Sequence, residues 1–256
     1  MGGFNTPRPP GTPLKRGLNA NMKQSLIIIP GWGGTKESWQ KFIDLAQNDF
    51  EVYFIALPGF GEMPPPTELW GVAEFVQYIK QEIVKLNLVK PIILGHSFGG
   101  QLAVNLVGNN PEIFSELILS GAAVLRPKYV CKRFILNVVA KAGKFIFNLP
   151  GINKFEKITR KIFYRVIDSP DYDKTDGMKR EIYKKIIRES QNEMLPKIKI
   201  PTLVVWGDKD SYVPLSEGKI IAKSIKDAKL VVIKNGKHGL HIQQPENLLK
   251  IIKENI

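Results

Sequence analysis

Short apolar runs recur along the chain, and stretches with helical periodicity separate them. The runs occupy residues 25–29, 51–56, 91–96, 116–121, 202–206 and 230–233. Because they are apolar throughout rather than alternating with polar residues, they are typical of strands covered on both faces. The stretches with helical spacing include 38–46, 68–86, 97–107 and 246–252. Strands separated by helices favour β-α-β units, so the pattern predicts an α/β fold with a mostly parallel sheet of about six strands flanked by helices.

This pattern is interrupted in two places. Residues 1–22 are rich in Pro, Gly and Asn without periodicity, and we expect a flexible N-terminal tail there. Residues 125–197 contain only helix-like segments, near 129–147, 153–167 and 178–193. An all-helical insertion into a parallel sheet usually lies above the carboxyl edge of the strands, where ligands bind. We therefore predict a core formed by 23–124 and 198–256, with a helical lid at 125–197.

Positive charge is concentrated in the predicted lid. The chain has 37 basic and 24 acidic residues and a formal charge of +13, of which the segment from Arg126 to Lys199 contributes +11. Basic residues alternate there with apolar ones at helical spacing, which is typical of a solvated helix face. The alternatives are a positive rim over a pocket and a patch that docks on an anionic membrane surface. Because no nucleic-acid-binding motif accompanies the charge, nucleic acid is not a favoured partner.

The composition narrows the class of protein further. Hydrophobic residues make up 43% of the chain and charged residues 24%, as in ordinary globular proteins. A single cysteine, Cys131, excludes an internal disulfide framework and a Cys-rich zinc site. No apolar run approaches the roughly 20 residues that span a bilayer, and the first residues contain no secretory h-region. We therefore expect a cytoplasmic globular protein.

One pentapeptide carries the strongest chemical signal. Gly95-His96-Ser97-Phe98-Gly99 matches the G-x-S-x-G pattern, follows an apolar strand and opens a helix. A sharp turn at this place exposes the serine hydroxyl at the carboxyl edge of the sheet, and the start of the helix adds positive potential beneath a developing oxyanion. The motif predicts Ser97 as a nucleophile. We expect the side chain of His96 to point away from it.

A serine nucleophile needs a base and a carboxylate. His238 follows the last strand-like run on a loop, and we favour it over His241, which we expect to pack near the final helix or cap it. Asp208 and Asp210 both follow the fifth run, and the residues alone leave both open as the acid. The chain order Ser, Asp, His is that of the hydrolase elbow fold and differs from the orders in chymotrypsin and subtilisin.

An oxyanion needs two backbone N–H donors. The first is expected from Phe98, directly after the nucleophile. The second is expected from Trp32, because the glycines on both sides of it in the loop 30–34 let its backbone turn toward Ser97. This loop does not match the glycine patterns that bind phosphate.

Four blocks of the sequence resemble the alpha/beta-hydrolase superfamily, in its lid-bearing branch of single-domain esterases, lactonases and carbon–carbon hydrolases. The blocks are PGWGG, LPGFG, GHSFGG and WGDKDSYVP…GKHGLHIQQPE, and the resemblance runs from about Lys23 to the C-terminus. It implies Asp210 rather than Asp208 as the acid, and His238 as the base. The chain departs from the family at Pro30, where His is usual, and at Ala56, where Asp is common. The family's first two strands are also absent, so we expect six strands instead of eight.

The resemblance implies a serine hydrolase that cleaves carboxylic ester or lactone bonds through an acyl-enzyme, without a metal or organic cofactor. The expected partner is a small-molecule ester or lactone, with an acyl chain or an anionic group suited to a basic lid, as in an N-acyl lactone. Relatives that open epoxides or remove halides use Asp as nucleophile, and Ser97 argues against both. The alternatives are a carbon–carbon bond hydrolase with the same triad and a non-catalytic small-molecule receptor on this fold.

Overall fold

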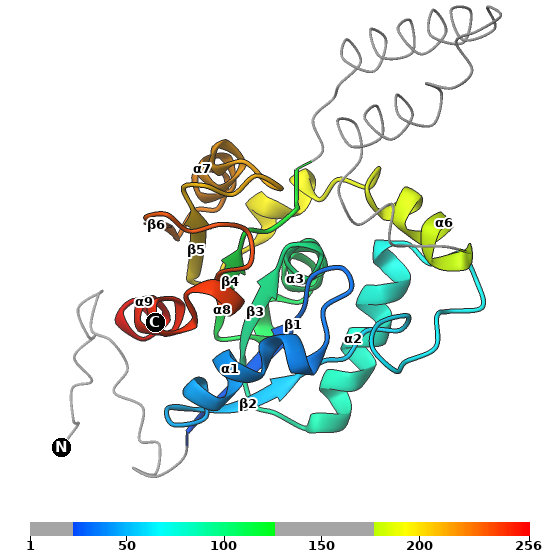
Figure 1. Ribbon diagram of the computed structural model, residues 1–256, viewed down its shortest axis with the longest axis horizontal. Coiled ribbons are helices and arrows are strands. Elements are labelled where there is room, and N and C mark those ends of the chain that lie inside the picture. The colour runs from blue at the N-terminus through cyan, green and yellow to red at the C-terminus, as the bar shows by residue number, and fades with distance from the viewer. Residues whose placement is uncertain (1–22, 126–176) are drawn as a thin grey trace, which may run out of the picture.

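A computed structural model describes residues 23–125 and 177–256 (Figure 1). Within them the chain forms a six-stranded sheet in which every pairing is parallel, which confirms the predicted fold class. The strands are β1 (Gln24–Ile29), β2 (Phe50–Phe54), β3 (Ile92–His96), β4 (Glu116–Ser120), β5 (Thr202–Gly207) and β6 (Ala228–Ile233). They coincide with the predicted apolar runs. The predicted tail and the 126–176 part of the predicted lid lie outside the described residues, so the domain boundaries stay a prediction.

The winding of the sheet reverses between β1 and β3. The order is β2-β1-β3-β4-β5-β6, so the chain passes from β1 outward to β2 and then returns to the other side of β1 with β3. Ligands of open α/β sheets bind where such a reversal separates two loops at the carboxyl ends of strands. The register pairs Ile29 with Gly95 and His96 with Ser120, so the ends of β1, β3 and β4 lie side by side.

Helices cover both faces of this sheet. Those of the described residues are α1 (Lys36–Ala46), α2 (Val72–Leu86), α3 (Phe98–Asn109), α6 (Gly177–Ile186), α7 (Leu215–Ser224), α8 (Leu240–Gln243) and α9 (Pro245–Asn255), with 3₁₀ turns at η1 (Pro111–Ile113) and η4 (Asn192–Lys197). The start of α1 is set by Thr35, whose side chain accepts the backbone N–H of Ser38 while the Ser38 hydroxyl accepts that of Thr35. Helix α7 was not predicted.

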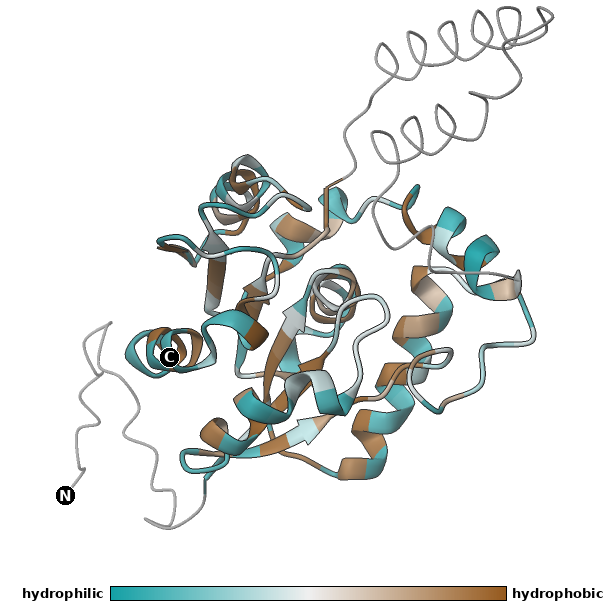
Figure 2. Ribbon diagram, in the orientation of Figure 1, coloured by the Kyte–Doolittle hydropathy of each residue, from teal (hydrophilic) through white to brown (hydrophobic). Residues whose placement is uncertain are grey.

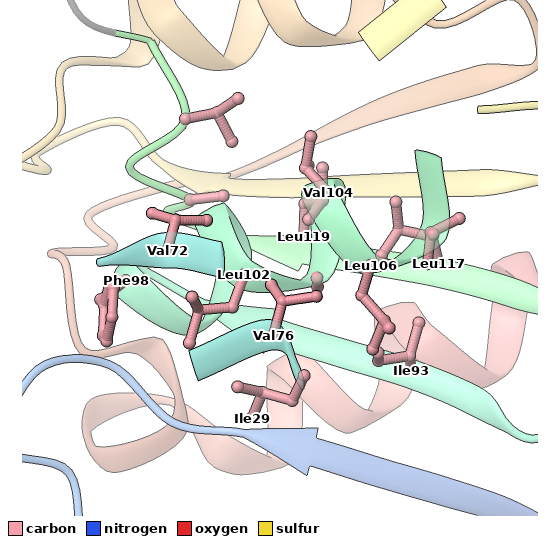
Figure 3. Close-up of a cluster of buried hydrophobic side chains, with 14 of the residues drawn as sticks. Ile29, Val72, Val76, Ile93, Phe98, Leu102, Val104, Leu106, Leu117 and Leu119 are labelled. Atoms are coloured by element: carbon pink, nitrogen blue, oxygen red, sulfur yellow. The ribbon is translucent and has the colours of Figure 1, made fainter. Parts of the chain in front are cut away.

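The sheet separates two hydrophobic clusters. Successive strand residues face opposite sides. Accordingly, Leu26 and Ile28 of β1 pack with helices α1 and α9, whereas Ile27 and Ile29 pack with α2 and α3. Figure 3 shows the second cluster, in which residues of β1, β3 and β4 meet α2 and α3. Figure 2 shows the same organisation: the strands are largely hydrophobic, and the helices beside them carry both hydrophobic and hydrophilic residues. Burial on both faces explains why these strands lack polar alternation.

The described part of the predicted lid packs on α2 and α3. Ile182, Tyr183 and Ile186 of α6 are buried in the cluster formed by these helices. The side-chain amide of Gln101 in α3 donates hydrogen bonds to the backbone oxygens of Ile186 at 3.2 Å and Glu189 at 2.6 Å. These contacts fix α6 beside the carboxyl edge of the sheet.

Among residues 23–125 and 177–256, no helix combines the length and the apolar character that a bilayer crossing requires. The cytoplasmic location stays a prediction.

Candidate active site

Ser97 occupies a strained turn between β3 and α3. Its backbone has φ 51° and ψ −115°, a combination that residues with a side chain rarely adopt and that costs about 1–3 kcal/mol. The surrounding backbone holds it there. The Ser97 N–H donates to the Ser120 oxygen at 3.1 Å, and the Ser97 oxygen accepts the N–H groups of Gly100 and Ala123 at 3.0 Å each. The turn therefore presents the Ser97 side chain at the carboxyl edge of the sheet, where the sequence predicted it.

Close backbone packing keeps this turn next to the loop 30–34. A Cβ atom on Gly99 would collide with the carbonyl oxygens of Ile29 and Pro30. Only a glycine lets the first turn of α3 approach the end of β1 so closely. Ser97 and Trp32 consequently line the same cavity. Neither Trp32 nor Phe98 donates its backbone N–H to any residue that the structure describes.

A carboxylate at the end of β5 orients the imidazole of His238. Asp210 Oδ2 lies 2.8 Å from His238 Nδ1, and the two side chains are 1% and 15% exposed. The other oxygen, Oδ1, accepts the backbone N–H groups of Tyr212 and Val213 at 2.9 Å each. Of the two aspartates that the sequence left open, Asp210 is thus the one that meets the histidine. Asp208 is exposed.

The pair formed by Asp210 and His238 rests on the end of β4. Gly121 has φ +53°, and a Cβ atom on it would lie 3.2 Å from both Asp210 Oδ2 and His238 Nδ1. A larger residue would need this unfavourable φ and would also push against both polar atoms. The residues that follow β3, β4 and β5, namely Ser97, Gly121 and Asp210, therefore lie at the same edge of the sheet.

His96 corrects an expectation from the sequence. We expected its side chain to point away from the site, but its ring centroid lies 4.8 Å from that of His238, and it lines the same cavity as Ser97. His96 Nδ1 lies 2.8 Å from the Ser120 oxygen. The loop that carries His238 folds against the end of β3, which brings the two imidazoles together.

The third histidine packs against α1. The ring of His241 stacks on that of Trp39, with centroids 3.8 Å apart and planes 9° apart. Burial lowers the pKa of His241 to about 3, and the charge of His238 adds to the effect. Burial likewise lowers the pKa of His96 well below its usual range, with smaller contributions from the charges of His241 and His238. His96 and His241 are therefore neutral near pH 7.

Ser97 and His238 line one cavity of about 370 Å³. Trp32, Tyr212 and Lys237 are also part of its wall. Asp210 lies behind His238 and does not line the cavity, and the aromatic ring of Phe98 is buried in the core. Sequence reasoning did not single out Tyr212, whose ring stacks on His238 with centroids 4.9 Å apart and planes 9° apart. In the sequence, Tyr212 could have been noticed as an aromatic residue in the loop that also carries Asp210.

The chain is similar to known hydrolases along most of its length. The family described as Hydrolase_4, serine aminopeptidase S33, matches residues 20–245. The pimeloyl-(acyl-carrier protein) methyl ester esterase of Wigglesworthia glossinidia brevipalpis is 28% identical over 249 residues, which cover 90% of this chain and 92% of that protein. The monoacylglycerol lipase ABHD6 of Homo sapiens is 24% identical over 251 residues, which cover 90% and 74%.

A solved structure supports the fold. The crystal structure of a hydrolase from Pseudomonas aeruginosa PA01 aligns with a TM-score of 0.67 and 21% identity, covering 91% of this chain and 89% of that one.

Proposed function

The chain belongs to the Hydrolase_4 family, described as serine aminopeptidase S33, within the alpha/beta-hydrolase superfamily, and on this basis we propose that it cleaves carboxylic ester or lactone bonds. One observation carries the proposal. The Asp210 carboxylate contacts His238, and His238 lines the same cavity as Ser97. A hydroxyl, an imidazole and a carboxylate in this relation are the groups that nucleophilic acyl transfer requires.

In the proposed first step, Ser97 Oγ attacks the substrate carbonyl carbon and its proton passes to His238 Nε2. With the Nδ1 proton directed to Asp210, Nε2 is free to accept this proton, and the carboxylate stabilises the imidazolium. The backbone N–H groups of Trp32 and Phe98 would hold the oxyanion of the tetrahedral intermediate. Their freedom from other described partners supports this role.

Collapse of the intermediate breaks the carbon–oxygen bond, and His238 returns its proton to the leaving alkoxide. The acyl group stays on Ser97. A water molecule then attacks the acyl carbon while His238 accepts its proton, and the carboxylic acid leaves with the serine proton restored. A lactone follows the same path, with its alcohol still attached to the acyl group.

The names of two relatives favour esters among the substrates of this superfamily. The two curated relatives described above are an esterase and a monoacylglycerol lipase, and both names refer to ester substrates.

A substrate panel tests the proposal. It contains p-nitrophenyl esters of increasing chain length, N-acyl lactones, an aminoacyl p-nitroanilide and a vinylogous diketone. We expect turnover of an ester or lactone, and a loss on the order of 10⁴-fold or more in Ser97→Ala with unchanged circular dichroism. Turnover of the diketone or the anilide alone would replace the ester assignment with a carbon–carbon or peptide bond hydrolase.

Covalent labelling separates an enzyme from a receptor. We expect a fluorophosphonate to label Ser97 in the native protein and not in Ser97→Ala. Labelling without turnover of any panel member favours the receptor alternative. Ester turnover that persists in Ser97→Ala would overturn the proposed mechanism.

A further inference from the structure

We propose that Tyr212 is a positioning residue for His238, whose ring holds the imidazole plane and stabilises the imidazolium formed when Ser97 is deprotonated. The inference rests on the proposed function, because it assigns His238 the role of base. Tyr212 contributes no atom to the bonds that form or break.

The geometry of the two rings carries the inference. The ring planes of Tyr212 and His238 are 9° apart and their centroids are 4.9 Å apart. A cation within about 6 Å of an aromatic centroid is attracted by the negative potential of the ring face. The imidazolium is such a cation, and it exists only when His238 carries the extra proton. The stacking energy therefore increases as the transition state forms.

Asp210 holds both residues that carry the stacked rings. Its Oδ2 contacts His238 Nδ1 at 2.8 Å, and its Oδ1 accepts the backbone N–H of Tyr212 at 2.9 Å. One buried carboxylate thus fixes the base and the backbone that carries the aromatic ring. Tyr212 is 45% exposed, so its position is not explained by burial in the core.

The other titratable groups around His238 do not replace Tyr212. His96 on β3 and His241 on α8 are neutral near pH 7, because burial lowers the pKa of each. Lys237 lines the same cavity, and its positive charge opposes an imidazolium. Among the described residues, Asp210 and Tyr212 are therefore the groups that favour the charged ring.

Two substitutions separate the aromatic face from the phenol hydroxyl. Tyr212→Leu removes the ring, and Tyr212→Phe keeps it. Cation–π energies predict a loss of about 2- to 30-fold in the rate of Ser97 labelling by fluorophosphonate for the leucine variant. They also predict that the acid limb of its pH profile moves down by roughly 0.4 to 1.5 pH units, because the charged ring becomes less stable. The phenylalanine variant should keep both values.

Tyr53→Leu is a matched control. Tyr53 lies on β2, several strands away from His238 in the order of the sheet. We expect its substitution to leave both the labelling rate and the position of the acid limb unchanged. A Tyr212→Leu protein with a slower rate but an unshifted acid limb would show a structural role only, and would overturn the inference.

A histidine NMR titration keeps this test independent of the proposed function. The chain has three histidines, so the ring signal of His238 is assigned from a His238→Asn variant. We expect its titration midpoint to fall in Tyr212→Leu and to stay unchanged in Tyr212→Phe. If Ser97 is never labelled, the proposed function fails, while the titration still reports on the stacking. An unchanged midpoint in Tyr212→Leu contradicts the inference even in an active enzyme.

Discussion

Ser97 and His238 are held in place by different means, although they line the same cavity. Ser97 follows β3, which pairs with a strand on each side, and its position is set by backbone hydrogen bonds and by the contact of Gly99 with the end of β1. His238 follows β6, the last strand of the sheet. Backbone contacts hold its loop, such as the hydrogen bond from the Lys209 N–H to the Gly236 oxygen at 2.9 Å, but side chains set the position of its imidazole, namely Asp210, Tyr212 and His96.

This difference predicts how the surroundings of Ser97 and of His238 respond to substitution. The proposed nucleophile is held by its backbone, so its position should survive removal of its hydroxyl but depends on small residues nearby. A side-chain-held base depends on each neighbour separately, and a change there should alter its protonation while leaving the fold intact. The following predictions test that separation, beginning with the largest expected effect.

Replacing Asp210 by Asn should damage activity most. The Asn oxygen would take the place of Oδ1, which accepts two backbone N–H groups, so the amide NH₂ would face His238 Nδ1. The imidazole would then carry its proton on Nε2 and could not accept one from Ser97. If the proposed triad acts, we expect kcat to fall on the order of 10⁴-fold, as in serine hydrolases with the same change, measured with the ester that the panel identifies.

Asp208→Asn is the matched control, because Asp208 is exposed at the same end of β5. It should retain normal kinetics. Equal losses in the two variants would mean that the contact between Asp210 and His238 does not orient the base.

Replacing Gly99 by Ala should destabilise the protein at the turn that holds Ser97. The added Cβ would collide with the carbonyl oxygens of Ile29 and Pro30, which are backbone atoms and cannot rotate away. We expect the free energy of unfolding to fall by about 1–3 kcal/mol or more, measured by urea denaturation. In the His238 loop, Gly239→Ala should change it by no more than roughly 0.5 kcal/mol, because its Cβ would lie 3.7 Å from the nearest atom of Ile242. Similar costs at the two sites would contradict the comparison.

Acid should destabilise the protein through its buried histidines. His241 has a pKa of about 3 when folded and about 6.5 when unfolded, so between these values only the unfolded chain binds the proton. The contribution of His241 to the free energy of unfolding is fully present above pH 6.5. It decreases by about 1.4 kcal/mol per pH unit as the pH falls toward 3. His241→Phe should flatten the pH dependence of the free energy of unfolding in that window. Parallel curves for the two proteins would argue against a neutral buried His241.

The sequence predicted the parts of the molecule whose physical cause is local. Strands buried on both faces give continuous apolar runs such as 25–29, and an elbow gives glycine around a serine, so the sheet and Ser97 could be recognised directly. Asp210 could not be chosen over Asp208 from spacing alone, because both lie in one loop. The family resemblance favoured Asp210, and only the folded loop shows which aspartate meets His238.

The features that the sequence did not predict have two other causes. Helix α7 escaped prediction because only Gly218 and Ile221 among its residues are buried, which leaves a weak apolar stripe. The neighbours of His96 depend on how the loop after β6 folds across the end of β3, and Tyr212 meets His238 through the same loop. Contacts between loops that are distant in the sequence leave no periodic pattern, so these features required the structure.

The positive φ of Ser97 limits which other nucleophiles this scaffold could use in enzyme engineering. A residue branched at Cβ is a severe outlier at φ 51°, so threonine cannot replace serine there although it offers the same hydroxyl. Cysteine and aspartate are unbranched at Cβ and carry a nucleophilic atom, so they fit the same turn. The shape of one peptide unit therefore excludes threonine as the nucleophile, while oxygen esters, thioesters and acyl anhydrides formed on serine, cysteine and aspartate stay open to engineering.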